Sequence, residues 1–275
     1  MTHLLYCGNK GVFTQILSSF LSLLLRSPGE TFEVSVLTMN LTRVKENYVA
    51  LGEKEENLLE EVAQSFSKEN HVTVKDVTDL YESEFAHCPN ENAYCSPYTL
   101  LRLFADKTES ENGKLLYLDA DIFFNKDVRL LSDTPLDGYE YAAAPDHYGK
   151  YFLSPRYINA GVLLFNMEEA RRTGLFEKAR AQIKKHKLPF ADQDALMRST
   201  TKKKMLPQKF NDQKFLHEST VVRHFSKRLF YLPYPHTANI KQDNIEMVHK
   251  VFHYHQFDDI YEVYKVWLKR YENEN

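Results

Sequence analysis

The stretch Leu116-Tyr117-Leu118-Asp119-Ala120-Asp121-Ile122-Phe123-Phe124 decides the fold prediction. Its apolar start predicts a buried strand over residues 114–118, and a nearly continuous apolar run is typical of a central strand in a parallel sheet. The strand leads directly into two aspartates at positions i and i+2, whose side chains project to one side of an extended chain. Because open α/β sheets bind ligands beyond the carboxyl ends of their strands, this motif predicts a functional site.

Strand and helix patterns alternate on both sides of this motif. Before it, we expect strands at 3–7, 32–38 and 72–77, and helices at 12–26, 53–68 and 98–106. After it, we expect strands at 139–144 and 161–165, helices at 175–187, 192–198 and 258–271, and an irregular segment over 205–244. Repeated β-α units of this kind predict an open α/β sheet flanked by helices. We divide the chain into one α/β domain over residues 1–240 and a helical extension over 241–275 that packs on it.

The composition is that of an ordinary globular protein, with 43% hydrophobic and 27% charged residues in 275. None of the nine glycines forms a G-x-G-x-x-G or G-x-x-x-x-G-K pattern, which excludes a glycine-built phosphate loop. The net charge of −3 hides an acidic stretch over 46–91 and a basic one over 178–228, and the basic one suits an anionic substrate, a cofactor or a membrane surface.

The cysteine pattern and the N-terminus favour a cytoplasmic protein. Three cysteines without a C-x-x-C pair exclude a disulfide framework and a zinc knuckle. The apolar segment 16–25 is too short to span a membrane and lacks a cleavage site, so we interpret it as part of a buried helix.

Two carboxylates at the end of an apolar strand repel each other unless a cation lies between them. Carboxylate oxygens suit Mg²⁺ or Mn²⁺, which commonly bridge to substrate phosphates. A turn with two solvated aspartates is the simplest alternative. Phosphatases of the haloacid dehalogenase type also place D-x-D after a strand, but they need Thr or Val where this chain has Phe123.

Three further stretches, read together with the D-x-D motif, resemble the sequence pattern of a known family. They are Tyr157-Ile-Asn-Ala-Gly-Val-Leu-Leu-Phe-Asn166, Ala191-Asp-Gln-Asp-Ala-Leu196 and Val222-Arg-His-Phe225. Together with 115–124, and in this order, they resemble glycosyltransferase family 8 over roughly residues 3–230. The resemblance implies a retaining enzyme that uses a nucleotide sugar. It also implies the GT-A fold, a Rossmann-like open mixed sheet flanked by helices with a C-terminal helical extension.

The resemblance also implies roles for individual residues. Asp119, Asp121 and His224 would hold Mn²⁺, with Mg²⁺ as the other candidate. The donor would be bound by Arg102, the Asp119-Ala120-Asp121 motif, Asn159, Asp192 and Lys227, and by the loop residues Cys7, Gly8, Asn9 and Gly11. Gln193 and Asp192 would lie at the reacting carbon, and Asp146 would contact the acceptor or a sugar.

Two departures from the family pattern bear on the donor site. Val12 stands where many members have the aromatic that stacks on uracil, so uridine rests on the resemblance alone. The lysine expected on the diphosphate is also missing, and Lys227 and Lys241 are the candidates to replace it.

We expect a UDP-sugar donor, glucose or galactose as the hexose, and a glycan or glycolipid acceptor in bacterial surface-glycan or lipopolysaccharide-type synthesis. No nucleic-acid partner is expected, whereas aromatic side chains of the C-terminal helix could contact the inner face of the membrane. The donor sugar, the linkage, the oligomeric state and the choice between front-face attack and double displacement stay open. A catalytically inactive sugar-nucleotide-binding protein is the main alternative.

Histidines gather near the C-terminus at positions 249, 253 and 255. The first and second of them share a helix face at i and i+4 spacing. Because neither a cysteine nor a well-spaced carboxylate is apparent beside them, we do not expect a zinc site there.

Overall fold

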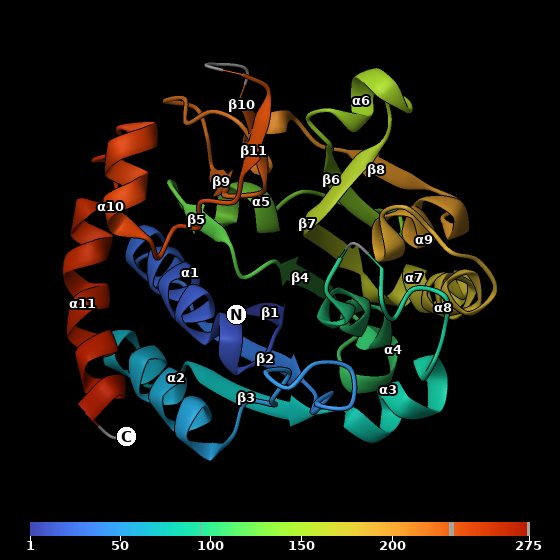
Figure 1. Cartoon of the computed structure of the whole chain (residues 1–275), viewed down its shortest axis with the longest axis horizontal. Helices are drawn as coiled ribbons and strands as arrows, with labels where there is room; N and C mark the ends of the chain where they lie inside the picture. Colours follow the sequence, from blue (N-terminus) through green and yellow to red (C-terminus); the bar gives the residue numbers. More distant parts are fainter. Residues whose placement is uncertain (94, 231–233, 274–275) are drawn as a thin grey trace.

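The computed structural model describes residues 1–93, 95–230 and 234–273. Its centre is a seven-stranded sheet with the order β3-β2-β1-β4-β7-β6-β8 (Figure 1). The strands are β1 (Thr2–Cys7), β2 (Phe32–Thr38), β3 (His71–Asp76), β4 (Lys114–Leu118), β6 (Tyr141–Pro145), β7 (Ile158–Asn166) and β8 (Lys203–Met205). Strands β1 to β4 are parallel, whereas β7 is antiparallel to both β4 and β6. The predicted open mixed sheet is confirmed, and β4 is its middle strand.

Helices cover both faces of this sheet. On one face lie α1 (Phe13–Arg26), α2 (Glu53–Phe66) and α11 (Asp258–Asn273). On the other lie the 3₁₀ helix η2 (Pro97–Phe104) and the helices α3 (Thr78–Phe85), α4 (Ala105–Thr108), α7 (Met167–Thr173), α8 (Leu175–Lys185) and α9 (Ala191–Ser199). Within the described ranges, no helix combines the length and the apolar character that crossing a bilayer requires.

Strand β4 shows why the sheet has a core on each side. Leu116 and Leu118 lie in the core under α1, whereas Leu115 and Tyr117 lie in the core under η2 and α8. All four side chains are at most 3% exposed, so β4 is buried on both faces. This explains why its sequence is apolar at consecutive positions and does not alternate.

The helix expected over 98–106 is wrong in type, because residues 97–104 form the 3₁₀ helix η2 before the short α4. The Arg102 Nε donates to the Thr99 carbonyl at 2.9 Å, an acceptor that an α-helix pairs with the amide four residues later. The hydrogen bond of the buried Arg102 side chain therefore occurs together with the tighter 3₁₀ winding of η2.

The segment expected to be irregular contains the strands β9 (Val222–His224), β10 (Arg228–Phe230) and β11 (His236–Ala238). Strand β9 pairs with β5 (Ile122–Phe124) in an antiparallel ribbon, with His224 opposite Ile122. This pairing brings the predicted metal-binding histidine next to the D-x-D motif, although the two lie about 100 positions apart in the sequence.

The remaining helical turns are short. They are η1 (Lys10–Val12), α5 (Arg129–Ser132), α6 (Gly149–Phe152), η3 (Gln208–Phe210), α10 (Ile245–Met247) and the π-helical turn η4 (Val248–Phe252). Tyr261 and Tyr264 of α11 are 2% exposed, so these aromatic side chains pack on the protein core and do not form an outer surface.

Candidate active site

The D-x-D motif lies in a tight turn between β4 and β5. The Asp119 amide donates to the Gly161 carbonyl at 2.8 Å, and the Asp121 carbonyl accepts from the Phe225 amide at 2.7 Å. The Ala120 carbonyl accepts from Gln242 Nε2, also at 2.7 Å. The two carboxylates therefore converge because a pinned turn directs them, and not because of the extended pleat expected from the sequence.

His224 completes a group that could hold a metal ion. Its Nε2 lies 3.1 Å from Asp121 Oδ1 and 3.8 Å from Asp119 Oδ2. One ligand atom from each of the three residues falls within 4.8 Å of the others. The structure thus brings together the three metal ligands that the resemblance implied.

A chain of hydrogen bonds fixes the tautomer of His224. Its Nδ1 lies 2.9 Å from Asn211 Oδ1, Asn211 Nδ2 donates to Asn159 Oδ1 at 2.8 Å, and Asn159 Nδ2 donates to Asp146 Oδ2 at 3.0 Å. A carboxylate only accepts, so every donor in the chain points toward Asp146. The proton of a neutral His224 therefore resides on Nδ1, which leaves the Nε2 lone pair facing the aspartates.

Gly161 is a glycine because His224 and Asp119 lie directly over it. A Cβ at this position would lie 2.3 Å from His224 Cε1 and 2.9 Å from Asp119 Oδ2. This close approach gives a physical reason for the glycine of the Asn-Ala-Gly-Val stretch. The backbone is shaped to leave space at the point where the two carboxylates and the imidazole converge.

Lys241 supplies a positive charge at the same point. Its ammonium group is ion-paired with Asp121 Oδ2 and lies 3.4 Å from the Phe225 carbonyl. Burial alone would raise the pKa of the Asp121 carboxyl, but the adjacent Lys241 ammonium holds this pKa well below its ordinary value. The Asp121 carboxyl is therefore ionised, as a metal ligand has to be.

Arg102 connects this group to Asp192, another of the residues predicted to bind the donor. The guanidinium is 1% exposed, and it lies 2.9 Å from Asp119 Oδ1 and 3.3 Å from Asp192 Oδ2. It also donates to the Ala160 carbonyl and stacks on the ring of Tyr117, 4.0 Å from its centroid. Burial raises the pKa of the Asp192 carboxyl, and the adjacent guanidinium opposes this only in part. In this arrangement Arg102 orients both carboxylates.

Gln193 and Asp194 follow on the same helix, and their oxygens are already engaged. The Gln193 Oε1 accepts from the Ala160 amide at 2.9 Å. The Asp194 Oδ1 accepts from the Tyr157 hydroxyl at 2.6 Å, and its Oδ2 accepts from the Phe190 amide at 3.0 Å. Helix α9 thus closes one wall of the site through hydrogen bonds to β7 and to the segment before it.

These residues surround one cavity of about 1030 Å³. The predicted site residues that line it are Arg102, Asp119, Asp121, Asp146, Asn159, Asp192, Gln193, His224 and Lys227, together with Lys241. Asp119, Asp121 and His224 lie beside the amides and carboxylates of β7 and α9, because Arg102 contacts both Asp119 and Asp192. Among the described residues, sequence reasoning missed Asn211 and Tyr117, whose hydrogen bonds orient His224 and Asp119.

The N-terminal loop does not line this cavity. Cys7 and Asn9 are buried, and the Gly8 amide donates to the Leu37 carbonyl at 3.0 Å, so this amide is not available to a nucleotide. A Cβ on Gly8 would lie 2.7 Å from Val12 Cγ2, so Gly8 allows the loop to pack against η1 and α1. A role of this loop and of Gly11 in binding the base stays a prediction.

Comparison with known proteins agrees with this geometry. The family model described as glycosyl transferase family 8 matches residues 34–269. A protein of Haemophilus influenzae named "Putative glycosyltransferase" is 28% identical over 129 residues, which are 42% of this chain and 38% of that protein. The chain thus matches well under half the length of this relative.

Solved structures share the fold. Galactosyltransferase LgtC, in complex with donor and acceptor sugar analogues, matches with a TM-score of 0.65 at 19% identity, over 81% of this chain and 86% of that chain. The glycosyltransferase GlyE of Streptococcus pneumoniae TIGR4 matches with a TM-score of 0.63 at 15% identity, over 95% of this chain and 63% of that chain. Mouse xyloside xylosyltransferase 1 matches with a TM-score of 0.56 at 15% identity, over 81% and 96%. These likenesses show the GT-A-like fold.

The family model extends over most of the chain and contains all four motifs on which the resemblance was based. The predicted family is therefore confirmed. The turn with Asp119 and Asp121, the ribbon with His224 and the helix with Gln193 all lie inside the matched residues, and the chain belongs to glycosyltransferase family 8.

Proposed function

We propose that this glycosyltransferase moves a hexose, glucose or galactose, from a UDP-sugar to an acceptor hydroxyl with retention of the α configuration. The observation that carries the proposal is the convergence of Asp119, Asp121 and His224 over Gly161, inside a cavity that further amides and carboxylates line. Diphosphates bind through divalent cations, and sugar hydroxyls bind through such polar side chains.

The ligand set supports Mn²⁺ as the metal, with Mg²⁺ as the other candidate. Carboxylate oxygens accept either ion, whereas an imidazole nitrogen shifts the preference toward Mn²⁺. When bound, the ion would act as a Lewis acid that neutralises charge on the leaving diphosphate. Lys241 and Lys227 both line the cavity and would bind the phosphate oxygens.

The sugar would lie against Asp146, Asn159 and Asp192, which line the same cavity as the proposed metal ligands. The engaged oxygens of Gln193 and Asp194 and the contact of Asp192 with Arg102 support front-face attack. A double displacement needs one of these oxygens as a free nucleophile on the sugar. In the front-face route the leaving phosphate takes the proton of the acceptor hydroxyl.

The acceptor is proposed to be a glycan or glycolipid of bacterial surface-glycan or lipopolysaccharide-type synthesis. Support comes from the tip of α6, where Tyr151, Phe152 and Leu153 are 74%, 82% and 57% exposed. The last two of these side chains also line the cavity. Exposed apolar side chains at the entrance of a site suit a sugar face or a lipid-linked acceptor at the inner face of a membrane.

The test is incubation of the full-length protein with a panel of UDP-sugars and Mn²⁺ while UDP release is followed. Slow hydrolysis of one donor, abolished by Asp121→Asn, is the expected result. The matched control is Asp127→Asn, which changes a half-buried aspartate that pairs with Arg129 and does not line the cavity. UDP release that persists in Asp121→Asn would contradict the proposed metal site.

Two further measurements separate the two alternative functions. Tight binding of a UDP-sugar in a calorimeter, without UDP release in the presence of any acceptor, would indicate an inactive sugar-nucleotide-binding protein. Release of phosphate from a generic phosphate ester would indicate a phosphatase. In the structure Asp119 Oδ1 accepts from Tyr117 and Arg102, which leaves it poorly suited to the nucleophilic role that a phosphatase needs.

A further inference from the structure

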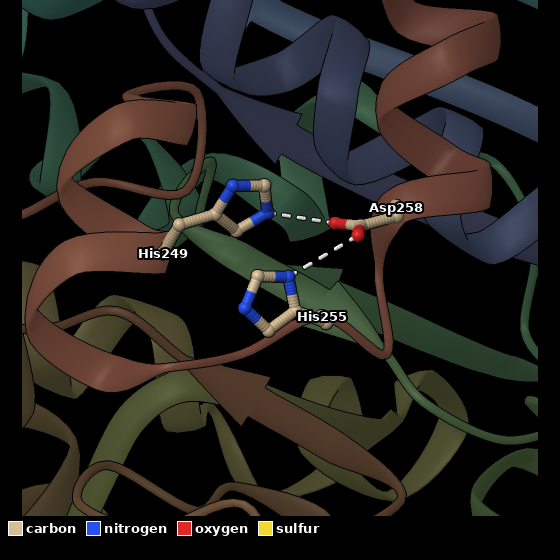
Figure 2. Close-up of side chains that lie close together, drawn as sticks. All are labelled: His249, His255 and Asp258. Atoms are coloured by element: carbon tan, nitrogen blue, oxygen red, sulfur yellow. Dashed lines mark hydrogen bonds and ion pairs between the residues drawn. The ribbon is translucent and has the colours of Figure 1, made fainter.

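A second group of potential metal ligands lies outside the cavity, at the start of α11. The group consists of His249, His255 and Asp258 (Figure 2). The His249 Nε2 lies 2.7 Å from Asp258 Oδ1, and the His255 Nδ1 lies 3.3 Å from Asp258 Oδ2. The two imidazole rings are stacked with their centroids 4.5 Å apart. In Figure 2 both rings point a nitrogen at the same carboxylate.

The backbone between the two histidines brings them together. His249 lies in the π-helical turn η4, and this turn is followed by His253, which adopts a left-handed conformation with φ of 56°. Left-handed backbone is uncommon for a residue other than glycine, and π-helical turns are frequent at functional sites. The reversal at His253 returns the chain so that the His255 ring lies on the ring of His249.

The donor set and its spacing suit a zinc-class cation. Ligand atoms about 2.0–2.1 Å from a tetrahedral metal lie roughly 3.3 Å from one another. The His249 Nε2 and the His255 Nδ1 lie 2.7 and 3.3 Å from the two different oxygens of the Asp258 carboxylate, and one ligand atom from each residue falls within 4.8 Å of the others. Two imidazoles and one carboxylate are a common zinc ligand set, with water in the fourth position. The side chains are 32%, 65% and 48% exposed, so an ion and its water reach them from solvent.

The helical spacing in the sequence related His249 to His253, whereas the structure groups His249 with His255. His253 is exposed and is not part of the group, whereas Asp258 supplies the carboxylate that we did not expect. We propose that His249, His255 and Asp258 form a second, structural site for Zn²⁺ or a similar divalent transition metal. This site is separate from the one at Asp119, Asp121 and His224, which is richer in carboxylate oxygens.

Such an ion would hold the C-terminal segment against the strand β5 that follows the D-x-D turn. The His249 ring packs on Tyr261 of α11 with centroids 5.8 Å apart, and Tyr261 packs on Phe123 at 5.6 Å. Phe123 lies in β5, directly after the D-x-D turn, and it pairs with Arg223 beside His224. Because a metal that binds only the folded state stabilises it, the ion would strengthen the anchor of the ribbon that carries the active-site ligands.

The test is calorimetric titration of ZnCl₂ into full-length Asp121→Asn, a background in which the active-site group is impaired. The measurement is made at slightly alkaline pH, where imidazoles are neutral. We expect this protein to bind Zn²⁺ and its melting temperature to rise with the metal. Adding His255→Ala or Asp258→Asn should weaken Zn²⁺ binding by more than about tenfold and remove the rise. Both residues are substantially exposed, so the variants should fold.

The matched control is His253→Asn in the same background. It removes an imidazole from the same segment, and asparagine tolerates the left-handed conformation. This control should keep the Zn²⁺ affinity and the shift in melting temperature. Equal Zn²⁺ affinity with and without His255→Ala would overturn the proposal, and so would an equal loss in His253→Asn. Neither result depends on transferase activity, so the outcome is independent of the proposed function.

Discussion

Asn211→Ala is the substitution that examines the hydrogen-bond chain behind the metal-binding histidine. Asn211 is fully buried, accepts from His224 Nδ1 at 2.9 Å and donates to Asn159 Oδ1 at 2.8 Å. Neutral imidazole carries its proton on either nitrogen. Without Asn211, the Nδ1 proton loses its acceptor, and the tautomer with a free Nε2 is no longer enforced.

The expected effect on metal binding follows from the role of such supporting groups. Removing the partner that orients a ligating histidine typically lowers metal affinity about ten- to a hundredfold. This corresponds to about 1.4–2.8 kcal/mol. Stability should also fall by about 1–3 kcal/mol, because one buried donor loses its partner. Asn159 Oδ1 keeps the Gly161 amide as a donor, so the acceptor side costs less.

Asn70→Ala is the matched control. Asn70 is also fully buried, accepts from the Phe32 amide at 2.8 Å and donates to the Ala63 carbonyl at 2.9 Å, at the opposite end of the sheet. Both variants therefore lose two side-chain hydrogen bonds and orphan one buried donor. Their unfolding free energies should fall by similar amounts, whereas only Asn211→Ala should weaken the metal site.

The assay is titration with MnCl₂ in the absence of donor, with free Mn²⁺ followed by electron paramagnetic resonance. Urea unfolding of the same samples measures stability. Mn²⁺ affinity of Asn211→Ala within about twofold of the parent protein would refute the tautomer argument, because the predicted loss is at least tenfold. An equal loss of affinity in Asn70→Ala would assign the effect to general destabilisation.

Three further predictions concern other parts of the structure. Gly161→Ala should fold but lose Mn²⁺ binding, because its Cβ would lie 2.3 Å from His224 Cε1; unchanged binding in the same resonance assay would show that the ring can move aside. Glu140→Gln should destabilise the protein by about 1–3 kcal/mol at neutral pH in urea unfolding, because the fully buried carboxylate accepts hydrogen bonds from Thr200, Thr201 and the Lys202 amide. Burial raises the pKa of Glu140, but these hydrogen bonds hold it below its ordinary value. The ionised carboxylate therefore stabilises the fold at pH values above its unfolded pKa, and the difference in unfolding free energy between the parent protein and Glu140→Gln should shrink as the pH falls. A free-energy difference that stays constant into acid would contradict this. Arg102→Lys should lower transferase turnover more than tenfold, since an ammonium cannot span two carboxylates and a carbonyl as the guanidinium does; near-normal turnover would limit Arg102 to a structural role.

The order of strands and helices could be predicted because the local pattern was strong. The apolar runs that became β1, β2 and β4 are buried on both faces, and the expected and observed ranges of β2 and β4 are identical. The type of η2 could not be predicted, because its winding accompanies the contacts of the Arg102 side chain with residues of β7 and α9. Those contacts depend on tertiary structure and leave no local signal.

The site residues were predicted from sequence motifs, but the physical reason for each motif lies in the residues of other segments that contact it. Gly161 could be anticipated as a residue type, because a glycine in an otherwise apolar strand marks a close approach. The approaching atoms belong to His224, which the β5–β9 ribbon brings there from elsewhere in the chain. Asn211 left no signal, since a lone asparagine in an irregular segment is compatible with many turns.

The division at residue 240 stays a prediction, and the structure gives a reason to study the tail together with the site. Lys241 pairs with Asp121, and Gln242 is fully buried and donates to the carbonyl of Ala120, so the first two residues of the extension contact the D-x-D turn. Arg26 of α1 also forms a two-pronged ion pair with Asp259 of α11. A side-chain amide on the Ala120 carbonyl fixes the turn more firmly than water would, because it is already ordered before the substrate binds. The C-terminal segment therefore helps to preorganise the two aspartates, and a perturbation in the tail should change metal affinity before it changes the stability of the central sheet.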